Sequence, residues 1–144
     1  MMTEKARKGI QRLADKSRDA IICSIDDEGY PTAKTVFIAR HEGLHTFWFS
    51  TNTSAIRTGN WRQRPKASVY LVNHLTFHGL NLTGEMEVLT DDATKQAFWK
   101  KGDEQYYPLG VTDPDYCILR FTARTGNYYH GLQKCLFDVA EFEG

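Results

Sequence analysis

Three parts of the chain are predicted to be helical, either from hydrophobic residues at helical spacing or from residues that typically start and end a helix. Near the start, Ile10, Leu13 and Ala14 stand among charged residues, which predicts an amphipathic helix within residues 1–17. The segment TNTSAIRTGNWRQRP offers Ser and Thr caps and a Pro stop, and predicts a short helix. The segment TDDATKQAFWKKG has an acidic first turn, a basic last turn and a closing Gly, and predicts a third helix.

Runs of alternating, β-branched or aromatic residues predict the strands. They are DAIICSID, PTAKTVFIAR, LHTFWFST, ASVYLVN, FHGLNLTGEMEVL, YCILRFTA, GNYYHG and CLFDVAEF, the last within a C-terminal strand expected over residues 132–144. Gly84 shares one side of its run with Leu82 and Met86, which indicates a bend or bulge. Regularly spaced short strands predict a mainly β fold, an antiparallel barrel with peripheral helices, because closure removes unpaired edges.

Length and charge narrow the classes of protein that need consideration. A chain of 144 residues with 41% hydrophobic residues is expected to form one domain, residues 1–144, around a single core. Eighteen Lys and Arg balance eighteen Asp and Glu, so no net charge draws the chain to nucleic acid or to anionic lipid. The N-terminal segment is charged throughout and no apolar run reaches the length of a membrane span, so we expect a cytoplasmic protein.

The cysteines and histidines do not predict a metal site. Cys23, Cys117 and Cys135 are far apart, form no Cys-x-x-Cys pair, and are interpreted as reduced structural thiols. His74 and His78 lie four residues apart, which in an extended strand separates their side chains by roughly 13 Å, too far to share a metal unless a turn folds the segment.

Other aromatic residues and histidines allow two interpretations each. His130 stands beside two tyrosines and either faces a ligand or packs in the core. Trp99 and the segment 106–108 would either cover a planar ring or cap the core. No nucleophile elbow, Walker loop or Gly-rich dinucleotide motif is present in the sequence, so no residue is assigned a catalytic role.

One segment gathers chemistry that suits a phosphate monoester. Two cations, three hydroxyls and a helix N-terminus are expected close together. They come from Lys34 in one predicted strand and from Ser50, Thr51, Ser54 and Arg57 at a strand-to-helix junction. Cations neutralise a dianion, hydroxyls donate to its oxygens, and the free N–H groups of a first helical turn point outward. The alternative is an ordinary helix cap with basic residues on the surface, which spacing alone does not exclude.

Several stretches resemble the pyridoxamine 5'-phosphate oxidase-like FMN-binding split-barrel superfamily, in particular its small general-stress-protein branch. They are AIICSIDDEGYPTAKTVF, FWFSTNTSAIR, LNLTGEMEVL and FWKKGDEQYYPLGVTDPDYCILRF, in that order. The resemblance runs from about Asp19 to Leu132 and implies an antiparallel split β-barrel of six to eight strands. It also implies a homodimer in which both subunits line each flavin site.

The resemblance implies flavin-binding roles for particular residues. Lys34 corresponds to a cation near the flavin phosphate or ribityl chain, and Thr35, Val36 and Phe37 would lie along the isoalloxazine edge. At the phosphate, it implies contributions from the junction residues Ser50, Thr51, Ser54 and Arg57.

The implied function is FMN binding by a flavin-dependent oxidoreductase with an unknown small-molecule substrate. The Arg- and His-containing C-terminal motif of true pyridoxamine phosphate oxidases is missing from GNYYHGLQKCLFDVAEFEG, so vitamin B6 oxidation is not expected. A haem-binding split-barrel protein and a non-catalytic flavin-binding stress or sensor protein remain alternatives, and a deazaflavin could replace FMN.

Overall fold

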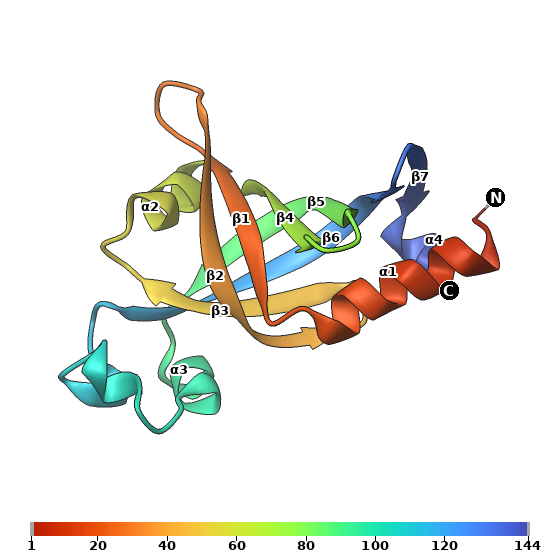
Figure 1. The fold of residues 1–144 in the computed structure, drawn as a ribbon. Helices are drawn as coiled ribbons and strands as arrows, with labels where there is room; N and C mark the ends of the chain where they lie inside the picture. The colour runs from red at the N-terminus through yellow and green to blue at the C-terminus, as the bar shows by residue number, and fades with distance from the viewer. Residues whose placement is uncertain (1, 144) are drawn as a thin grey trace.

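Seven strands form one antiparallel sheet in the computed structural model of the chain, which describes residues 2–143 (Figure 1). The strands are β1 (Asp19–Ile25), β2 (Pro31–Glu42), β3 (Thr46–Asn52), β4 (Lys66–Asn73), β5 (His78–Leu89), β6 (Tyr116–His130) and β7 (Gln133–Asp138). The helices are α1 (Glu4–Lys16), α2 (Ile56–Gln63), α3 (Asp92–Phe98) and α4 (Val139–Glu143), with the 3₁₀ turns η1 (Asp103–Gln105) and η2 (Gly110–Thr112).

Pairing between β3 and β6 closes the barrel. The sheet runs in the order β3-β2-β1-β4-β5-β6-β7, and the extra pairing of β3 with β6 joins the first six strands into a ring. The first half of β6 pairs with β3, and its second half, from Thr125, pairs with β7 instead. The closed six-stranded barrel with one added strand confirms the predicted mainly β split barrel with peripheral helices.

The last third of the chain differs from the sequence-based prediction. The runs YCILRFTA and GNYYHG form a single strand, because the polar residues between them continue the pairing with β5. The predicted C-terminal strand over residues 132–144 is wrong in part, since only β7 is extended and helix α4 follows it. Val139 and Phe142 stand three residues apart and are both buried, a spacing that places them on one face of a helix. The predicted bulge at Gly84 is confirmed by a register shift there.

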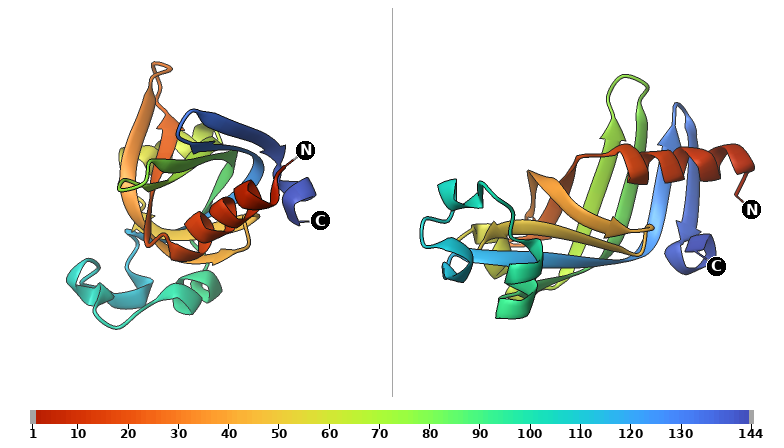
Figure 2. Two further views of the ribbon diagram at one scale, coloured as in Figure 1. Left: turned by 45° about the vertical axis from the view of Figure 1, so that its right-hand side comes forward. Right: turned by 90° about the horizontal axis from the view of Figure 1, so that it is seen from below.

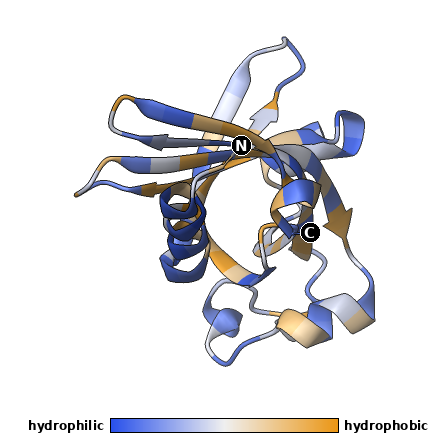
Figure 3. Ribbon diagram, turned by 90° about the vertical axis from the view of Figure 1, so that its right-hand side faces the viewer, coloured by the Kyte–Doolittle hydropathy of each residue, from blue (hydrophilic) through white to orange (hydrophobic). Residues whose placement is uncertain are grey.

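Helix α1 packs on the main core at one end of the barrel. Ile10, Leu13 and Ala14 are buried, as their spacing predicted, and Thr3 caps the helix by accepting a hydrogen bond from the amide of Ala6. The polar face of α1 stays exposed and makes the helix predominantly hydrophilic (Figure 3). No helix within residues 2–143 has the length and hydropathy needed to cross a membrane.

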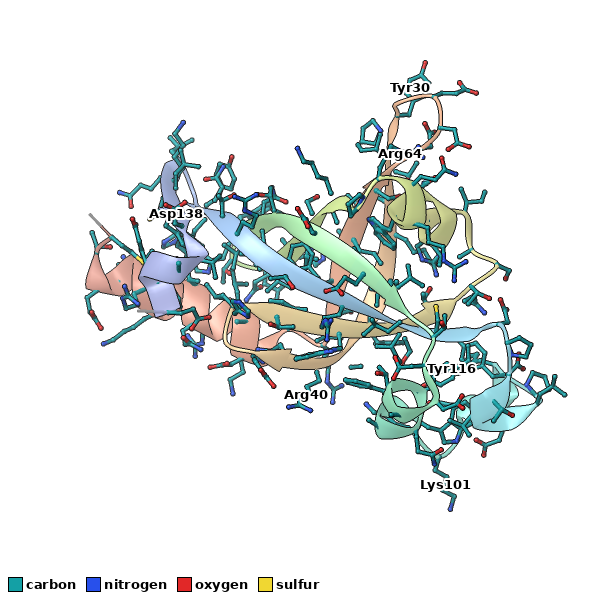
Figure 4. The ribbon with its side chains drawn as sticks, turned by 180° about the vertical axis from the view of Figure 1, so that it is seen from behind. Tyr30, Arg40, Arg64, Lys101, Tyr116 and Asp138 are labelled. Carbon is teal, nitrogen blue, oxygen red and sulfur yellow. The ribbon has the colours of Figure 1, made fainter. Side chains whose placement is uncertain are left out.

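A second, smaller hydrophobic cluster packs α3 and the turns after it against β3 and β6. Tyr116 lies at its centre, where its ring contacts Trp99 and Tyr107 (Figure 4). Its phenol donates to the Lys95 carbonyl oxygen at 3.0 Å. Trp99 and Tyr107 therefore cap a core of their own chain, whereas Tyr106 is 68% exposed.

Candidate functional site

Strands β2 and β3 separate at the end of the barrel that carries α2. They pair only between Ile38 and Glu42 of β2, with a bulge after Ile38. Residues 31–37 pair with β1 on one side, and in the described part of the chain no strand pairs with their other edge. An unpaired edge exposes backbone N–H and C=O groups that need partners. This edge forms one wall of the candidate site.

Helix α2 and the β1–β2 hairpin are joined at this end. Arg64, which ends α2, donates to the carbonyl oxygen of Ile25 at 3.0 Å and to the carboxylate of Asp27 at 2.8 Å. Figure 4 shows Arg64 near the base of the hairpin that carries Tyr30 at its tip. These bonds hold the open edge of β2 in place relative to the helix.

A carboxylate from the turn just before β6 fixes the turn that leads into α2. Asp115 accepts hydrogen bonds from Asn52 Nδ2 at 3.0 Å, Thr53 Oγ1 at 3.1 Å and the Ser54 amide at 2.8 Å. Hydrogen bonding by Ser54, and then by Asn52 and Thr53, lowers the pKa of Asp115 to about 2. The Ser54 amide is therefore already engaged by an anion of the protein itself.

Arg57 is the cation best placed for a ligand in this region. Its Nη2 donates to Thr51 Oγ1 at 2.6 Å, and Thr51 is only 2% exposed. The Nε of Arg57 is buried and has no hydrogen-bond partner among residues 2–143. An unpaired, buried N–H of a charged group is costly, so this geometry suits an anion that is yet to bind.

A short series of hydrogen-bonded side chains connects α2, which carries Arg57, to β2, which carries Lys34. Asn60 of α2 donates to Ser24 Oγ at 3.1 Å, and Ser24 shares a 2.8 Å hydrogen bond with Thr32 of β2. Lys34 stands two residues from Thr32 and so shares its face of the strand, while Arg57 stands one turn before Asn60 on the helix. Lys34 and Arg57 therefore face the same space. The sequence analysis did not find Asn60, Ser24 or Thr32.

Alternation along β2 divides the other predicted residues between two faces. Val36 shares the face of Lys34 and packs against the core. Thr35 and Phe37 point to the opposite face, where Phe37 is 80% exposed. Their side chains do not join the Arg57 group, although their backbone lies on the open edge.

The same alternation separates Ser50 from Thr51 on β3. Thr51 points inward to Arg57, whereas Ser50 lies on the other face with its hydroxyl beside the Tyr116 phenol. The structure thus brings Thr51 and Arg57 into contact, has Lys34 on the face of β2 that carries Thr32, has Ser54 three residues before Arg57, and leaves Ser50 beside Tyr116.

A cysteine lies behind this site. Cys117 is buried, with its Sγ 3.6 Å from the Thr51 carbonyl oxygen, and burial raises the pKa of its thiol to about 11. All three cysteines have free thiols, and within the described residues no group of three or more His, Cys, Asp or Glu side chains could hold a metal ion.

A comparison with known protein families identifies the family of this chain. Residues 2–130 match the family described as Pyridoxamine 5'-phosphate oxidase. The chain belongs to this family. No curated protein matches the sequence significantly.

Solved structures place this member of the pyridoxamine 5'-phosphate oxidase family beside general stress proteins. A Clostridium acetobutylicum protein related to general stress protein 26 is 38% identical, with a TM-score of 0.88, covering 98% of this chain and 99% of the other. General stress protein 26 of Bacillus anthracis is 16% identical, with a TM-score of 0.72 and coverage of 91% and 98%. The first of these, at 38% identity, confirms the resemblance to the general-stress-protein branch, and the second shows the same fold.

One further neighbour shares the fold alone. A heme binding protein from Mycobacterium smegmatis is 16% identical, with a TM-score of 0.76, and the match covers 99% of this chain and 61% of that one.

Proposed function

We propose that the protein binds FMN, with the flavin phosphate at Arg57, and acts as a flavin-dependent oxidoreductase on a small molecule other than pyridoxamine phosphate. The observation that carries the proposal is the Nε of Arg57, which is buried and has no hydrogen-bond partner in residues 2–143, while Nη2 of the same guanidinium donates to the Thr51 hydroxyl. A guanidinium presents several N–H donors in a fork that matches phosphate oxygens.

The charges around the turn suit a phosphate dianion. Arg57 and Lys34 supply two positive charges against the single carboxylate of Asp115, and Lys34 has no ion-pair partner in residues 2–143. Because the Ser54 amide donates to Asp115, we assign the main phosphate contacts to side chains, Arg57, Thr51 and Lys34, with Ser54 at the edge. The unpaired backbone of residues 34–37 would then hydrogen bond along the flavin ring.

The flavin supplies hydride or electron transfer when it is bound. This chain's part is to bind and orient the cofactor: the cations hold its phosphate, and the edge of β2 fixes the position of its ring. We also place the protein in the cytoplasm, where its three free thiols would remain reduced.

FMN and riboflavin together test the phosphate assignment, because they differ only in that group. FMN fluorescence quenching on titration should show Arg57→Ala weakening FMN about 10- to 100-fold, as expected for a lost charge-assisted hydrogen bond of roughly 1.5–3 kcal/mol. Riboflavin affinity should stay unchanged, as should FMN affinity in the control Arg124→Ala, an exposed cation on β6. An equal loss for both flavins would contradict the assignment, and a haem spectrum in the purified protein would favour the haem alternative.

We further propose that the protein is a homodimer that covers the open side of this site. Phe37 and Ile56 are large apolar side chains, each 80% exposed, on the strand and helix that form the site. Large apolar side chains that stay exposed suit an interface. Light scattering should report twice the mass of one chain, and Phe37→Glu should shift the mass toward one chain. Leu132→Glu, an exposed apolar residue on the β6–β7 turn, should leave it unchanged, and a monomer that still binds FMN tightly would overturn the shared site.

A further inference from the structure

A large cleft lies at the other end of the barrel from Arg57. It has a volume of about 1010 Å³ and is bounded by α1, the turn between β4 and β5, and the start of β7. Figure 2 shows α1 running beside the β4–β5 and β6–β7 hairpins, and Figure 1 shows α2 at the opposite side of the sheet. The volume is in the upper range of sites for small organic ligands.

The walls of this cleft are strongly basic although the whole chain has no net charge. Six cations and one carboxylate, that of Asp19, line it; the cations are Lys5, Lys8, Arg12, Lys16, Arg18 and Lys134. Within residues 2–143 none of the six takes part in an ion pair. Their charges are therefore available to a ligand.

Four of these cations form a stripe along α1. Lys5, Lys8, Arg12 and Lys16 follow one another at spacings of three and four residues, so they share a face of the helix over roughly 16 Å. Like charges at this spacing destabilise a helix. No ion pair compensates the repulsion between these four cations within residues 2–143. An uncompensated row of cations is typical of a surface that binds an anion.

A histidine pair lies at the bottom of the cleft. The rings of His78 and His130 meet edge to face with centroids 3.9 Å apart, and Thr76 Oγ1 is 3.0 Å from His78 Nδ1. The Nε2 of His78 is buried without a hydrogen-bond partner in the described residues. Burial, then His130, Lys5 and Arg12, lower the pKa of His78, so this ring stays neutral near pH 7 and offers an N–H donor or acceptor. The turn at 74–77 brings His74 to the same cleft.

We propose that this cleft binds a small polyanion, a molecule with two or more phosphate or carboxylate groups spaced along its length. The stripe on α1, continued by Arg18, contacts successive anionic groups from one wall, and Lys134 contacts them from β7. The His78–His130 pair binds the group that reaches the bottom. This site is separate from Arg57 and does not depend on flavin binding.

Calorimetric titration of the full-length protein with inorganic tripolyphosphate tests the site directly. We expect one tripolyphosphate per chain, with affinity that falls several-fold when salt is raised, because screening weakens exposed charges. The double variant Arg12→Gln with Lys134→Gln should weaken binding at least tenfold. The control Lys100→Gln with Lys101→Gln removes the same charge from exposed positions after α3, and should change binding less than twofold.

Three comparisons identify the ligand class and separate this site from the flavin site. Tighter binding of ATP than of tripolyphosphate would show that the histidine pair also contacts a ring, and binding of citrate in place of tripolyphosphate would identify carboxylates. Arg57→Ala should leave tripolyphosphate affinity unchanged. The proposal is overturned if no probe binds saturably, if both double variants lose affinity equally, or if FMN displaces tripolyphosphate.

Discussion

Asp115 offers the sharpest test of how the turn before α2 is held. Its carboxylate accepts hydrogen bonds from Asn52, Thr53 and the Ser54 amide, so the turn depends on a residue more than sixty positions later, just before β6. Asp115→Asn keeps the shape of the side chain, but it removes the charge and turns one acceptor into a donor that faces other donors. We expect this variant to be less stable at neutral pH.

The size of the effect follows from the pKa of Asp115. Hydrogen bonding lowers that pKa from 3.8 to about 2, and one pKa unit corresponds to about 1.4 kcal/mol. The full shift would give roughly 2.5 kcal/mol, but the carboxylate is partly exposed and solvent screening reduces this to about 1 kcal/mol. Because the folded pKa is the lower one, this stability is present above 3.8 and is lost as the pH falls toward 2.

Urea unfolding followed by circular dichroism measures both features. At pH 7, Asp115→Asn should lower the free energy of unfolding by about 1 kcal/mol, and the deficit should shrink by about half at pH 3. Glu28→Gln is the control, since Glu28 is exposed in the β1–β2 turn and its side chain makes no hydrogen bond within residues 2–143. A deficit equal to that of Glu28→Gln, or one independent of pH, would refute the role of the carboxylate.

Two glycines should respond in opposite directions to alanine. A Cβ on Gly84 would overlap the Thr122 carbonyl oxygen and lie 3.0 Å from the Ala123 Cα, so Gly84→Ala should cost about 3 kcal/mol of unfolding free energy in urea titrations. A loss below 1 kcal/mol would show that the bulge relaxes easily. Gly59 lies in α2 with no atom within 4 Å of its Cβ position, so Gly59→Ala should raise the melting temperature by stabilising the helix by about 0.5–1 kcal/mol. A lower melting temperature would contradict the open environment.

Local patterns predicted the parts of the fold that depend on near neighbours. Ile10, Leu13 and Ala14 are buried because a helix repeats every 3.6 residues, and Phe47 and Phe49 are buried because a strand repeats every two. In the last third of the chain, the sequence predicts two strands, YCILRFTA and GNYYHG, with a break before Gly126. The structure has one strand, β6, whose neighbour changes from β3 to β7 at this point, and the spacing of residues in the sequence does not show such a change of partner.

The partners of the candidate site could not be predicted for a related reason. Asp115 reaches the turn before α2, and Asn60 reaches Ser24, only because the segment before β6, helix α2 and strand β1 meet at one end of the barrel. Each of these residues is an ordinary polar residue in the sequence, with no motif around it. Their roles depend on contacts between elements far apart along the chain.

Strand geometry divides the consecutive residues that the resemblance names into side-chain and backbone contributors. Consecutive strand residues point to opposite faces, so Thr35 cannot share a side-chain site with Lys34, nor Ser50 with Thr51. What consecutive residues do share is an edge of backbone, and the edge of β2 is open where β3 turns away. The phosphate site that we propose at this end would therefore combine alternate side chains with a helix. Arg57 would be its main residue, because among residues 2–143 it is the one cation there with a buried and unpartnered N–H.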